Sequence, residues 1–248
     1  MFRVTRHGFK EMLIGSVVLV AVAAGTGYFG PWLWPLTLLA VLTLIWLFAF
    51  FRDPERVIPA EERIMVSPAD GTVSDVTEIA SEPLLGGEPA VRIGIFLSVF
   101  NVHVNRSPCD GKVLSIAYKK GKFINAMSHA RASDENESNT VVLGEPTTGR
   151  PVAVVKQIVG LIARRIIFTA EKGEQLKMGQ RIGMIKFGSR TELVIPKWLA
   201  PEVMVKEGQV VRGGADVIAR LGNPIHTTRT QKADDQEFEA LATRQTPT

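Results

Sequence analysis

The stretch that decides the fold is "RIGMIKFGSRTELVIP", residues 181–196. The residues on either side of the Gly188-Ser189 pair are rich in Ile, Val and Leu and predict β-strands. Gly188 and Ser189 interrupt this strand pattern. An isolated glycine in a strand pattern often marks a bulge. The other interpretation is that the backbone is cut at this point, and the rest of the chain decides between the two.

The same strand pattern extends over residues 53–222. Short Val- and Ile-rich runs alternate there with Gly, Pro and Asp-Gly turns, a spacing typical of β-sandwiches and barrels. The turns in 171–183 and 205–219 resemble those of the barrel-sandwich lipoyl and biotinyl carrier domains. We therefore expect a β-rich, mainly antiparallel, barrel-sandwich-like domain at 53–222. A polar tail at 223–248 is expected to be disordered.

Residues 12–51 form 40 consecutive positions without a charged side chain. Since one membrane span needs about 20 apolar residues, this run predicts a transmembrane helical hairpin with helices at 12–29 and 32–51. One helix plus a re-entrant segment is the alternative. Residues 1–52 would then anchor the chain. Basic residues flank the run on both sides, which places the β-rich domain in the cytoplasm; they are Arg3, Arg6, Lys10, Arg52 and Arg56.

Composition excludes some classes of protein. The single cysteine, Cys109, rules out an intramolecular disulfide framework and fits a reducing compartment. The net charge of +4 comes without a dense basic stripe, so we expect no nucleic-acid partner. We also expect no metal ion.

Few residues of the β-rich domain can supply acid–base chemistry. His103 follows a buried-looking strand, and Ser189 is not part of a G-x-S-x-G elbow. A Ser–His–Asp set could still form from Ser189, His103 and an aspartate, because triads are recognised by geometry and role. Two similar turns offer that aspartate, "SPADGTV" at 67–73 and "SPCDGKV" at 107–113. On their own residues, Asp70 and Asp110 are equally good turn residues.

Five motifs in order resemble the phosphatidylserine decarboxylase family, in its short form with an N-terminal membrane hairpin. They are "FFRDPER" at 50–56, "SPADG" at 67–71, "FNVHVNRSP" at 100–108, "VGLIARRI" at 159–166 and "GMIKFGSRTELVIP" at 183–196. The resemblance runs from about residue 10 to about residue 220. Many members read Leu-Gly-Ser-Thr where this chain reads Phe-Gly-Ser-Arg, but the Gly-Ser core is intact.

The resemblance implies self-cleavage between Gly188 and Ser189, giving a β chain of 1–188 and an α chain of 189–248. Ser189 would become a covalent pyruvoyl group, the only cofactor. The triad for the cut would be Asp70, His103 and Ser189, with Asp70 preferred over Asp110 because "SPADG" is the family's aspartate motif. His103 is also the candidate proton donor in decarboxylation.

The implied reaction converts phosphatidylserine to phosphatidylethanolamine and carbon dioxide through a pyruvoyl Schiff base. The partners would be phosphatidylserine in the bilayer, other membrane lipids and the chain's own α and β pieces; a homodimer is compatible with it. The site would lie at the cytoplasmic face of the inner cell membrane. Asn101, Arg106 and Lys120 are either contacts for phosphate or carboxylate, or solvated loop residues.

Three alternatives remain at this point. One is a relative that acts on another serine-headed lipid. A second is a membrane-anchored carrier or adaptor that uses Lys177 or no chemistry. The third is a serine hydrolase in which Ser189 keeps its hydroxyl.

Overall fold

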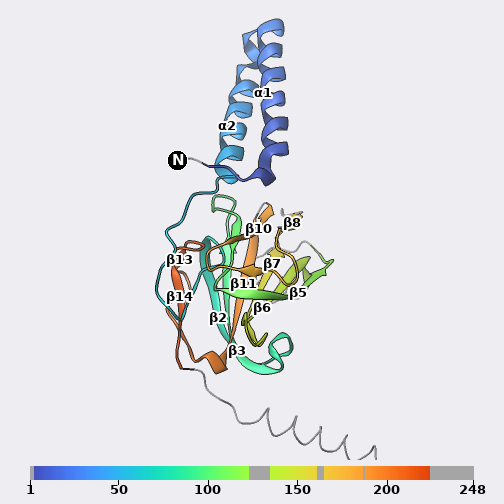
Figure 1. The fold of residues 1–248 in the computed structure, drawn as a ribbon. Helices are drawn as coiled ribbons and strands as arrows, with labels where there is room; N and C mark the ends of the chain where they lie inside the picture. The colour runs from blue at the N-terminus through green and yellow to red at the C-terminus, as the bar shows by residue number, and fades with distance from the viewer. Residues whose placement is uncertain (1–2, 123–134, 161–164, 187, 224–248) are drawn as a thin grey trace, which may run out of the picture.

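The computed structural model describes residues 3–122, 135–160, 165–186 and 188–223. It has two parts, a pair of long helices and a β-rich domain from which the helices project (Figure 1). Apart from Asn223, the tail expected at 223–248 lies outside the described residues.

The two helices form the predicted hairpin. Helix α1 is Phe9–Phe29 and helix α2 is Trp34–Phe50. The chain reverses direction at Gly30 and Pro31. Gly30 has a φ of 113°, which glycine adopts readily, and Pro31 begins the 3-10 turn Pro31–Leu33. The stretches Arg6–Phe29 and Pro31–Phe50 are both long and apolar enough to cross a membrane, with mean hydropathies of 1.9 and 2.2.

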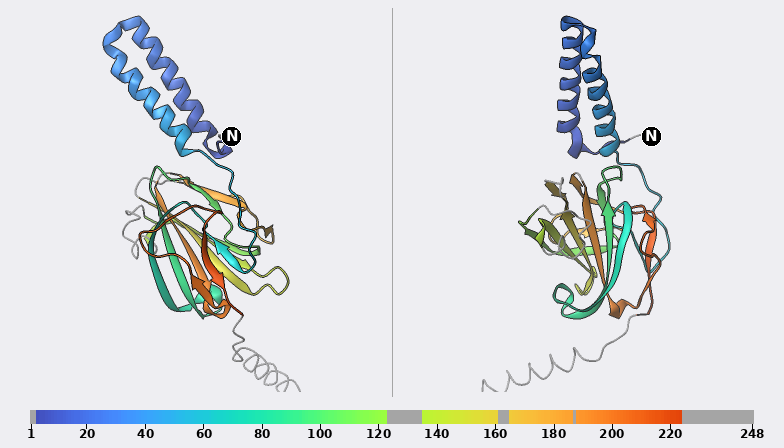
Figure 2. Two further views of the ribbon diagram at one scale, coloured as in Figure 1. Left: turned by 90° about the vertical axis from the view of Figure 1, so that its left-hand side faces the viewer. Right: turned by 180° about the vertical axis from the view of Figure 1, so that it is seen from behind.

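The β-rich domain contains three sheets, and all the strand pairs described within them are antiparallel. The largest has the order β13-β2-β3-β11-β7-β6-β5-β9, and the two smaller sheets have the orders β4-β10-β8 and β1-β14-β12. The prediction of a β-rich, mainly antiparallel domain is confirmed. Two further views show the large sheet curling around the interior (Figure 2).

The bounds of the strands are β1 Ile64–Val66, β2 Gly71–Glu82, β3 Glu88–Leu97, β4 Val104–Arg106, β5 Gly111–Lys119, β6 Ser138–Gly144, β7 Pro151–Val159, β8 Arg165–Phe168, β9 Gln175–Leu176, β10 Arg181–Lys186, β11 Ser189–Pro196, β12 Pro201–Val203, β13 Val210–Val211 and β14 Val217–Leu221.

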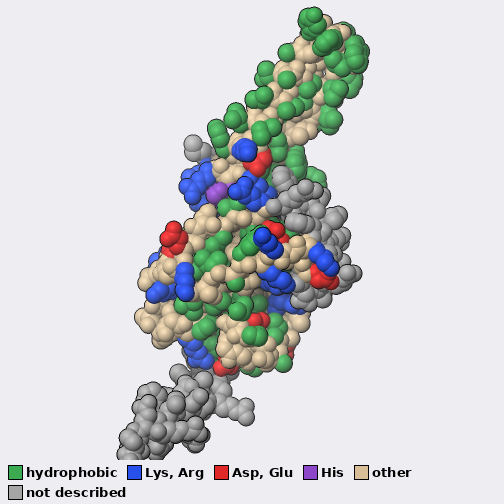
Figure 3. Space-filling model, turned by 90° about the vertical axis from the view of Figure 1, so that its right-hand side faces the viewer, with side chains coloured by type: hydrophobic (Ala, Val, Ile, Leu, Met, Phe, Trp, Pro, Cys, Tyr) green, Lys and Arg blue, Asp and Glu red, His purple; other side chains and the backbone are tan. Residues whose placement is uncertain are grey.

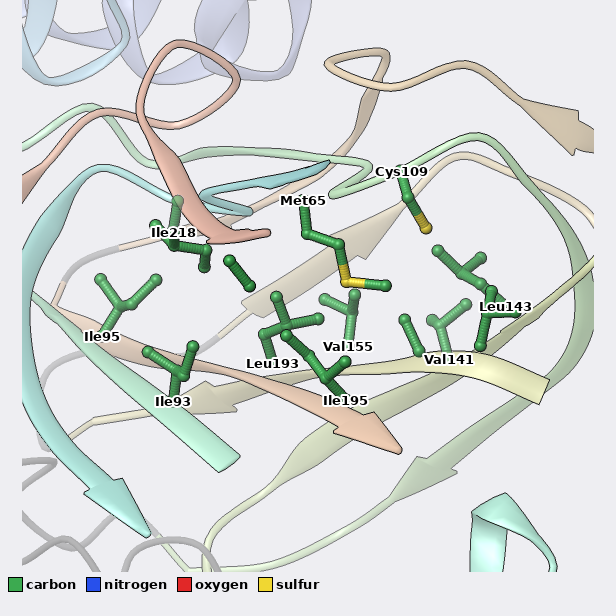
Figure 4. Packing of buried hydrophobic residues seen from close by; sticks show 14 of the residues in the cluster. Met65, Ile93, Ile95, Cys109, Val141, Leu143, Val155, Leu193, Ile195 and Ile218 are labelled. Carbon is green, nitrogen blue, oxygen red and sulfur yellow. The ribbon is translucent and has the colours of Figure 1, made fainter. Parts of the chain in front are cut away.

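The main core lies on one face of the large sheet. Alternate residues of each strand point to the same face, so Leu193 and Ile195 of β11 pack with Ile93 and Ile95 of β3. Met65, from the small sheet β1-β14-β12, closes the cluster from the other side (Figure 4). The core therefore fixes β11 at the centre of the domain, between β3 and β7.

The two Asp-Gly turns occupy equivalent places in a pseudo-symmetric framework. Ser67 Oγ donates to the Ala69 carbonyl at 2.7 Å, and Ser107 Oγ donates to the Cys109 carbonyl at 2.8 Å. Each turn then begins a long strand, β2 or β5, whose first residues pair with a two-residue strand, β13 or β9. The similarity between the stretches at 67–73 and 107–113 thus reflects a repeated turn.

A tightly packed joint connects the hairpin to the β-rich domain. Phe50 and Phe51, at the end of α2, are buried with Met12 of α1 and Met184 of β10. Gly8 faces the Phe51 ring so closely that a Cβ there would lie 2.1 Å from it. The hairpin is thus packed against the domain and not joined by a free linker.

Candidate active site

The Gly188-Ser189 pair is a corner between two sheets. Strand β10 ends at Lys186 in the sheet β4-β10-β8, and Ser189 is the first residue of β11 in the large sheet. Strand β11 pairs with β3 and β7 without a register shift, so the interruption is not a bulge within one strand. Gly188 has a φ of +65°, a left-handed conformation that favours glycine.

Ser189 is completely buried, and its hydroxyl lacks a hydrogen-bond partner among the described residues. Its backbone is held by neighbours on both sides, Leu97 of β3 and Val159 of β7. An unpaired buried hydroxyl costs free energy, and such groups call for an explanation, which can be a catalytic role. Ser189 Oγ is therefore the strongest candidate for a reacting atom.

The carbonyl of Gly188 accepts a hydrogen bond from the Gly160 N–H at 3.1 Å. Gly160 follows directly after β7, next to the start of β11. A backbone donor on a carbonyl oxygen is the arrangement that stabilises negative charge when a nucleophile adds to that carbonyl. The sequence analysis did not assign this role, although Gly160 lies within the motif "VGLIARRI".

His103 lies against the same peptide. Its Nε2 accepts a hydrogen bond from the Gly188 N–H at 3.3 Å, and its Nδ1 lies 3.0 Å from the Asn101 carbonyl oxygen. An N–H can only donate and a carbonyl can only accept. We therefore assign the proton to Nδ1 and a lone pair to Nε2, which faces the Gly-Ser corner.

The ring of His103 is shielded from water. The aromatic ring of Phe50 lies over it with a centroid distance of 4.3 Å and an interplanar angle of 33°. Burial lowers the pKa of His103 to about 4; the Asn101 hydrogen bond opposes this shift and the Arg52 charge adds to it. His103 is consequently neutral at physiological pH and able to accept a proton.

Asp70 is buried in its turn but is not hydrogen-bonded to His103. Its Oδ2 accepts from Arg56 Nη2 at 2.6 Å, and its Oδ1 accepts from the Gly213 N–H at 2.8 Å. Burial raises the pKa of Asp70, while the charge of Arg56 opposes that rise. The charge of Arg52 also lowers the pKa of Asp70.

Asp110 occupies the matching turn but differs in its surroundings. It accepts from the Met178 N–H at 2.7 Å and pairs with Lys177 at 3.2 Å. Its side chain is 57% exposed, whereas that of Asp70 is 13% exposed. Asp110 is therefore a surface turn residue, and Lys177, the alternative carrier lysine, is engaged with it.

The other polar candidates have structural partners. Asn101 Oδ1 accepts from the backbone N–H and hydroxyl of Ser98. Arg106 is buried and donates to Asp53 and to the carbonyl oxygens of Gly179 and Pro54. Lys120 is exposed. Of these, only Asn101 touches the site, through its backbone carbonyl on His103.

Arg190, directly after Ser189, points to the opposite face of β11. It is fully buried and donates to Asp75 at 2.6 Å, to Glu192 at 2.9 Å and to Ser74. Gly94 leaves room for it, since a Cβ there would lie 2.0 Å from Arg190 Nη2. This charged cluster gives a physical reason for Arg in the Phe-Gly-Ser-Arg variant of the motif.

The fold and these residues define a class of protein, a β-rich domain that carries a buried serine–histidine site at a glycine corner, beside a pair of apolar helices. The family profile described as "Phosphatidylserine decarboxylase" matches residues 44–219. The chain belongs to the phosphatidylserine decarboxylase family, and its enzymatic class is that of a decarboxylase, a lyase.

Individual relatives carry the name of the same family. The chain is 47% identical over 216 residues to the "Phosphatidylserine decarboxylase proenzyme" of Carboxydothermus hydrogenoformans, an alignment that covers 87% of this chain and 95% of the relative. A protein of the same name from Rhodopirellula baltica is 42% identical over 215 residues, 87% of each chain. A third, from Granulibacter bethesdensis, is 45% identical over 214 residues, 86% of this chain and 83% of the relative.

Proposed function

We propose that the protein decarboxylates phosphatidylserine in a membrane after cutting its own backbone between Gly188 and Ser189, and that the new N-terminus of the α chain carries a pyruvoyl group made from Ser189. The observation that carries this proposal is the buried Ser189 Oγ, which has no hydrogen-bond partner in the described part of the chain, next to a Gly188 carbonyl that accepts from Gly160.

The first step is attack of Ser189 Oγ on the Gly188 carbonyl carbon. His103 Nε2 lies against the same peptide and takes the hydroxyl proton, because a serine hydroxyl is a weak nucleophile without a nearby base. The Gly160 N–H stabilises the oxyanion that forms. Collapse breaks the C–N bond, the amine receives the proton, and an ester joins the Gly188 carbonyl to Ser189 Oγ.

The second step removes that ester. Loss of the Ser189 α-proton expels the Gly188 carboxylate, and the resulting enamine becomes an imine by proton transfer. One water molecule then hydrolyses the imine and releases ammonia, leaving the ketone. The residues present fit this group, since the backbone at Ser189 is held by β3 and β7 and its side chain fills a dry, buried position.

When formed, the pyruvoyl carbonyl supplies an electron sink for the charge left when carbon dioxide departs. The chain's own residues shield that position from bulk water and hold a proton-transfer group beside it. Phe50 covers His103, and Asn101 fixes its ring orientation. The low pKa keeps His103 unprotonated at neutral pH, so its Nε2 can accept the hydroxyl proton in the uncut chain. Asp70, which pairs with Arg56, is the third member of the proposed triad.

Membrane attachment is part of the proposal. The apolar side chains of α1 and α2 face outward, a surface suited to lipid. Lys and Arg side chains gather at the base of the hairpin, where it meets the β-rich domain (Figure 3). Positive charge at that level suits the anionic headgroups of the cytoplasmic leaflet. The lipid substrate would thus reach the site from the bilayer.

The test is a denaturing mass measurement of the purified protein. We expect two fragments, residues 1–188 and 189–248, the second lacking a free amine at its N-terminus. An intact chain of 27.1 kDa with an ordinary Ser189 would overturn the proposal. Ser189→Ala should abolish both cleavage and carbon dioxide release, because it removes the nucleophile. Ser81→Ala, at an exposed serine, is the matched control and should process normally.

A further inference from the structure

A groove runs along the helical hairpin. It has a volume of about 410 Å³ and lies between α1 and α2, with walls that include Ile14, Val18, Val22, Ala40 and Leu44. Its walls are apolar along most of their length. We call it the hairpin groove. Water gains little in such a site, so a suitable occupant is a hydrocarbon chain.

One end of the hairpin groove is charged. Glu11 lines it there, and Glu11 Oε1 accepts from Lys186 Nζ at 2.5 Å. The second carboxylate oxygen, Oε2, is buried and has no hydrogen-bond partner among the described residues. A buried, unpaired carboxylate oxygen is costly and offers an acceptor to a ligand that brings a donor.

The charged end lies beside the candidate active site. Lys186 is the last residue of β10, two positions before Gly188 in the sequence. Leu47, which also lines the groove, packs in one cluster with Phe50, and the Phe50 ring covers His103. The groove therefore connects the lipid-facing hairpin with the residues that surround Ser189.

We propose that the hairpin groove holds one acyl chain of the phosphatidylserine substrate, and that Glu11 Oε2 accepts a hydrogen bond from the headgroup ammonium at the entrance to the site. This inference rests on the proposed function. The ammonium is the only charged donor of that headgroup. Lys186, which pairs with Glu11, carries the opposite charge to the phosphate and carboxylate of the headgroup. An apolar chain that ends in a headgroup with both positive and negative groups fits an apolar groove that ends at a Glu11–Lys186 pair.

The first experiment fills the groove. Val18→Trp places a large ring in it, while Val17→Trp places the same ring on a neighbouring exposed position outside it. The measured quantity is the ratio of KM for dioleoyl phosphatidylserine to KM for dihexanoyl phosphatidylserine in mixed micelles. We expect Val18→Trp to raise this ratio about tenfold, the effect of roughly two methylene groups left unburied. Val17→Trp should keep the wild-type ratio.

The second experiment changes the acceptor. Glu11→Gln should raise KM about tenfold for both substrates, because they share a headgroup, and should leave the fraction of cleaved chains as in the wild type. A change in kcat or in cleavage with an unchanged KM would instead mean that Glu11 only supports the fold through Lys186, and would overturn its assignment.

The two proposals fail in different ways. Absence of carbon dioxide release by the wild type from either substrate would refute the proposed function. Normal release with equal KM ratios in Val18→Trp and Val17→Trp would refute the hairpin groove alone.

A readout independent of activity uses the Ser189→Ala protein and phosphatidylserine with a photoreactive acyl chain. Labelling of the hairpin should be competed by unlabelled phosphatidylserine, and labelling that persists under competition would count against the groove.

Discussion

At the scale of single residues, the candidate site combines a buried serine with a buried histidine. Ser189 Oγ has no hydrogen-bond partner among the described residues, and His103 Nε2 accepts from the Gly188 N–H. Asp70 lies in a buried turn, where it pairs with Arg56 and not with His103. The catalytic roles of Ser189, His103 and Asp70 are predictions.

The repeated turn offers a matched test of Asp70. Asp70→Asn should slow self-cleavage at least roughly tenfold, because it removes the negative charge that would stabilise a protonated His103. The measurement is the fraction of cut chains after cell-free synthesis.

Asp110→Asn is the matched control for this change. It makes the same substitution in the equivalent turn, where the aspartate is exposed and paired with Lys177, so cleavage should proceed at the wild-type rate. Equal rates in the two variants would remove Asp70 from the mechanism.

The burial of His103 predicts the pH dependence of cleavage. Its folded-state pKa of about 4 lies below its ordinary value of 6.5, so His103 remains an unprotonated base down to about pH 5. We expect the cleavage rate to be level from neutral pH to about pH 5 and to halve near pH 4. The measurement is the rate of fragment formation after synthesis at each pH. A midpoint near 6.5 would contradict the assignment of the base.

The same shift affects stability. Between pH 6.5 and 4 the unfolded chain binds a proton at His103 that the folded chain does not bind. Stability therefore falls as pH decreases through this window, and His103 contributes no loss above about pH 6.5.

At the scale of elements, the corner between β10 and β11 constrains the Gly188-Ser189 peptide. Gly188 supplies the left-handed turn, and the end of β7 brings the Gly160 N–H to the Gly188 carbonyl. In the proposed self-cleavage, this N–H would stabilise the oxyanion.

Gly160→Pro tests the donor. Proline has no N–H, so we expect cleavage to slow by about 10²-fold, the usual cost of one lost oxyanion donor. Gly160→Ala keeps the N–H and serves as the control, with a rate close to that of the wild type. The measurement is again the time course of fragment formation, together with circular dichroism to verify that both variants fold. A Pro variant that folds and cleaves as fast as the Ala variant would exclude this role.

At the scale of the whole molecule, the segment "FFRDPER" connects the helical hairpin with the β-rich domain through nearly every side chain. Phe50 covers His103, and Arg52 donates to the Phe100 carbonyl. Asp53 pairs with Arg106 and Arg181, and Arg56 pairs with Asp70. The motif is therefore the joint that fixes the hairpin, and any lipid beside it, relative to Ser189.

Asp53→Asn tests the joint. Asp53 and Arg106 are both buried, and removal of one partner from a buried ion pair costs about 3–5 kcal/mol. We expect the free energy of unfolding in detergent to fall by about that amount. The control, Asp216→Asn, breaks the pair with Arg212, whose side chain is 62% exposed, and should cost less than about 1 kcal/mol. Equal losses would show that the joint is not a stabilising element.

The sequence by itself determined the features that depend on local patterning. The long uncharged run indicated apolar helices, the Val- and Ile-rich runs indicated strands, and the Gly-Ser pair marked an interruption of the strand pattern. The motifs also indicated the family. These properties follow from the side chains of neighbouring residues, so they can be read along the chain.

Only the tertiary structure decided what meets at the corner. His103 and Gly188 are 85 positions apart in sequence, and their contact depends on the pairing of β4 with β10. Gly160, Phe50 and Arg56 lie in motifs that gave no hint of their partners. The repeated turns of Asp70 and Asp110 read alike in sequence, and burial against the joint separates them. Such contacts depend on strand register and packing between distant segments, which local sequence patterns do not specify.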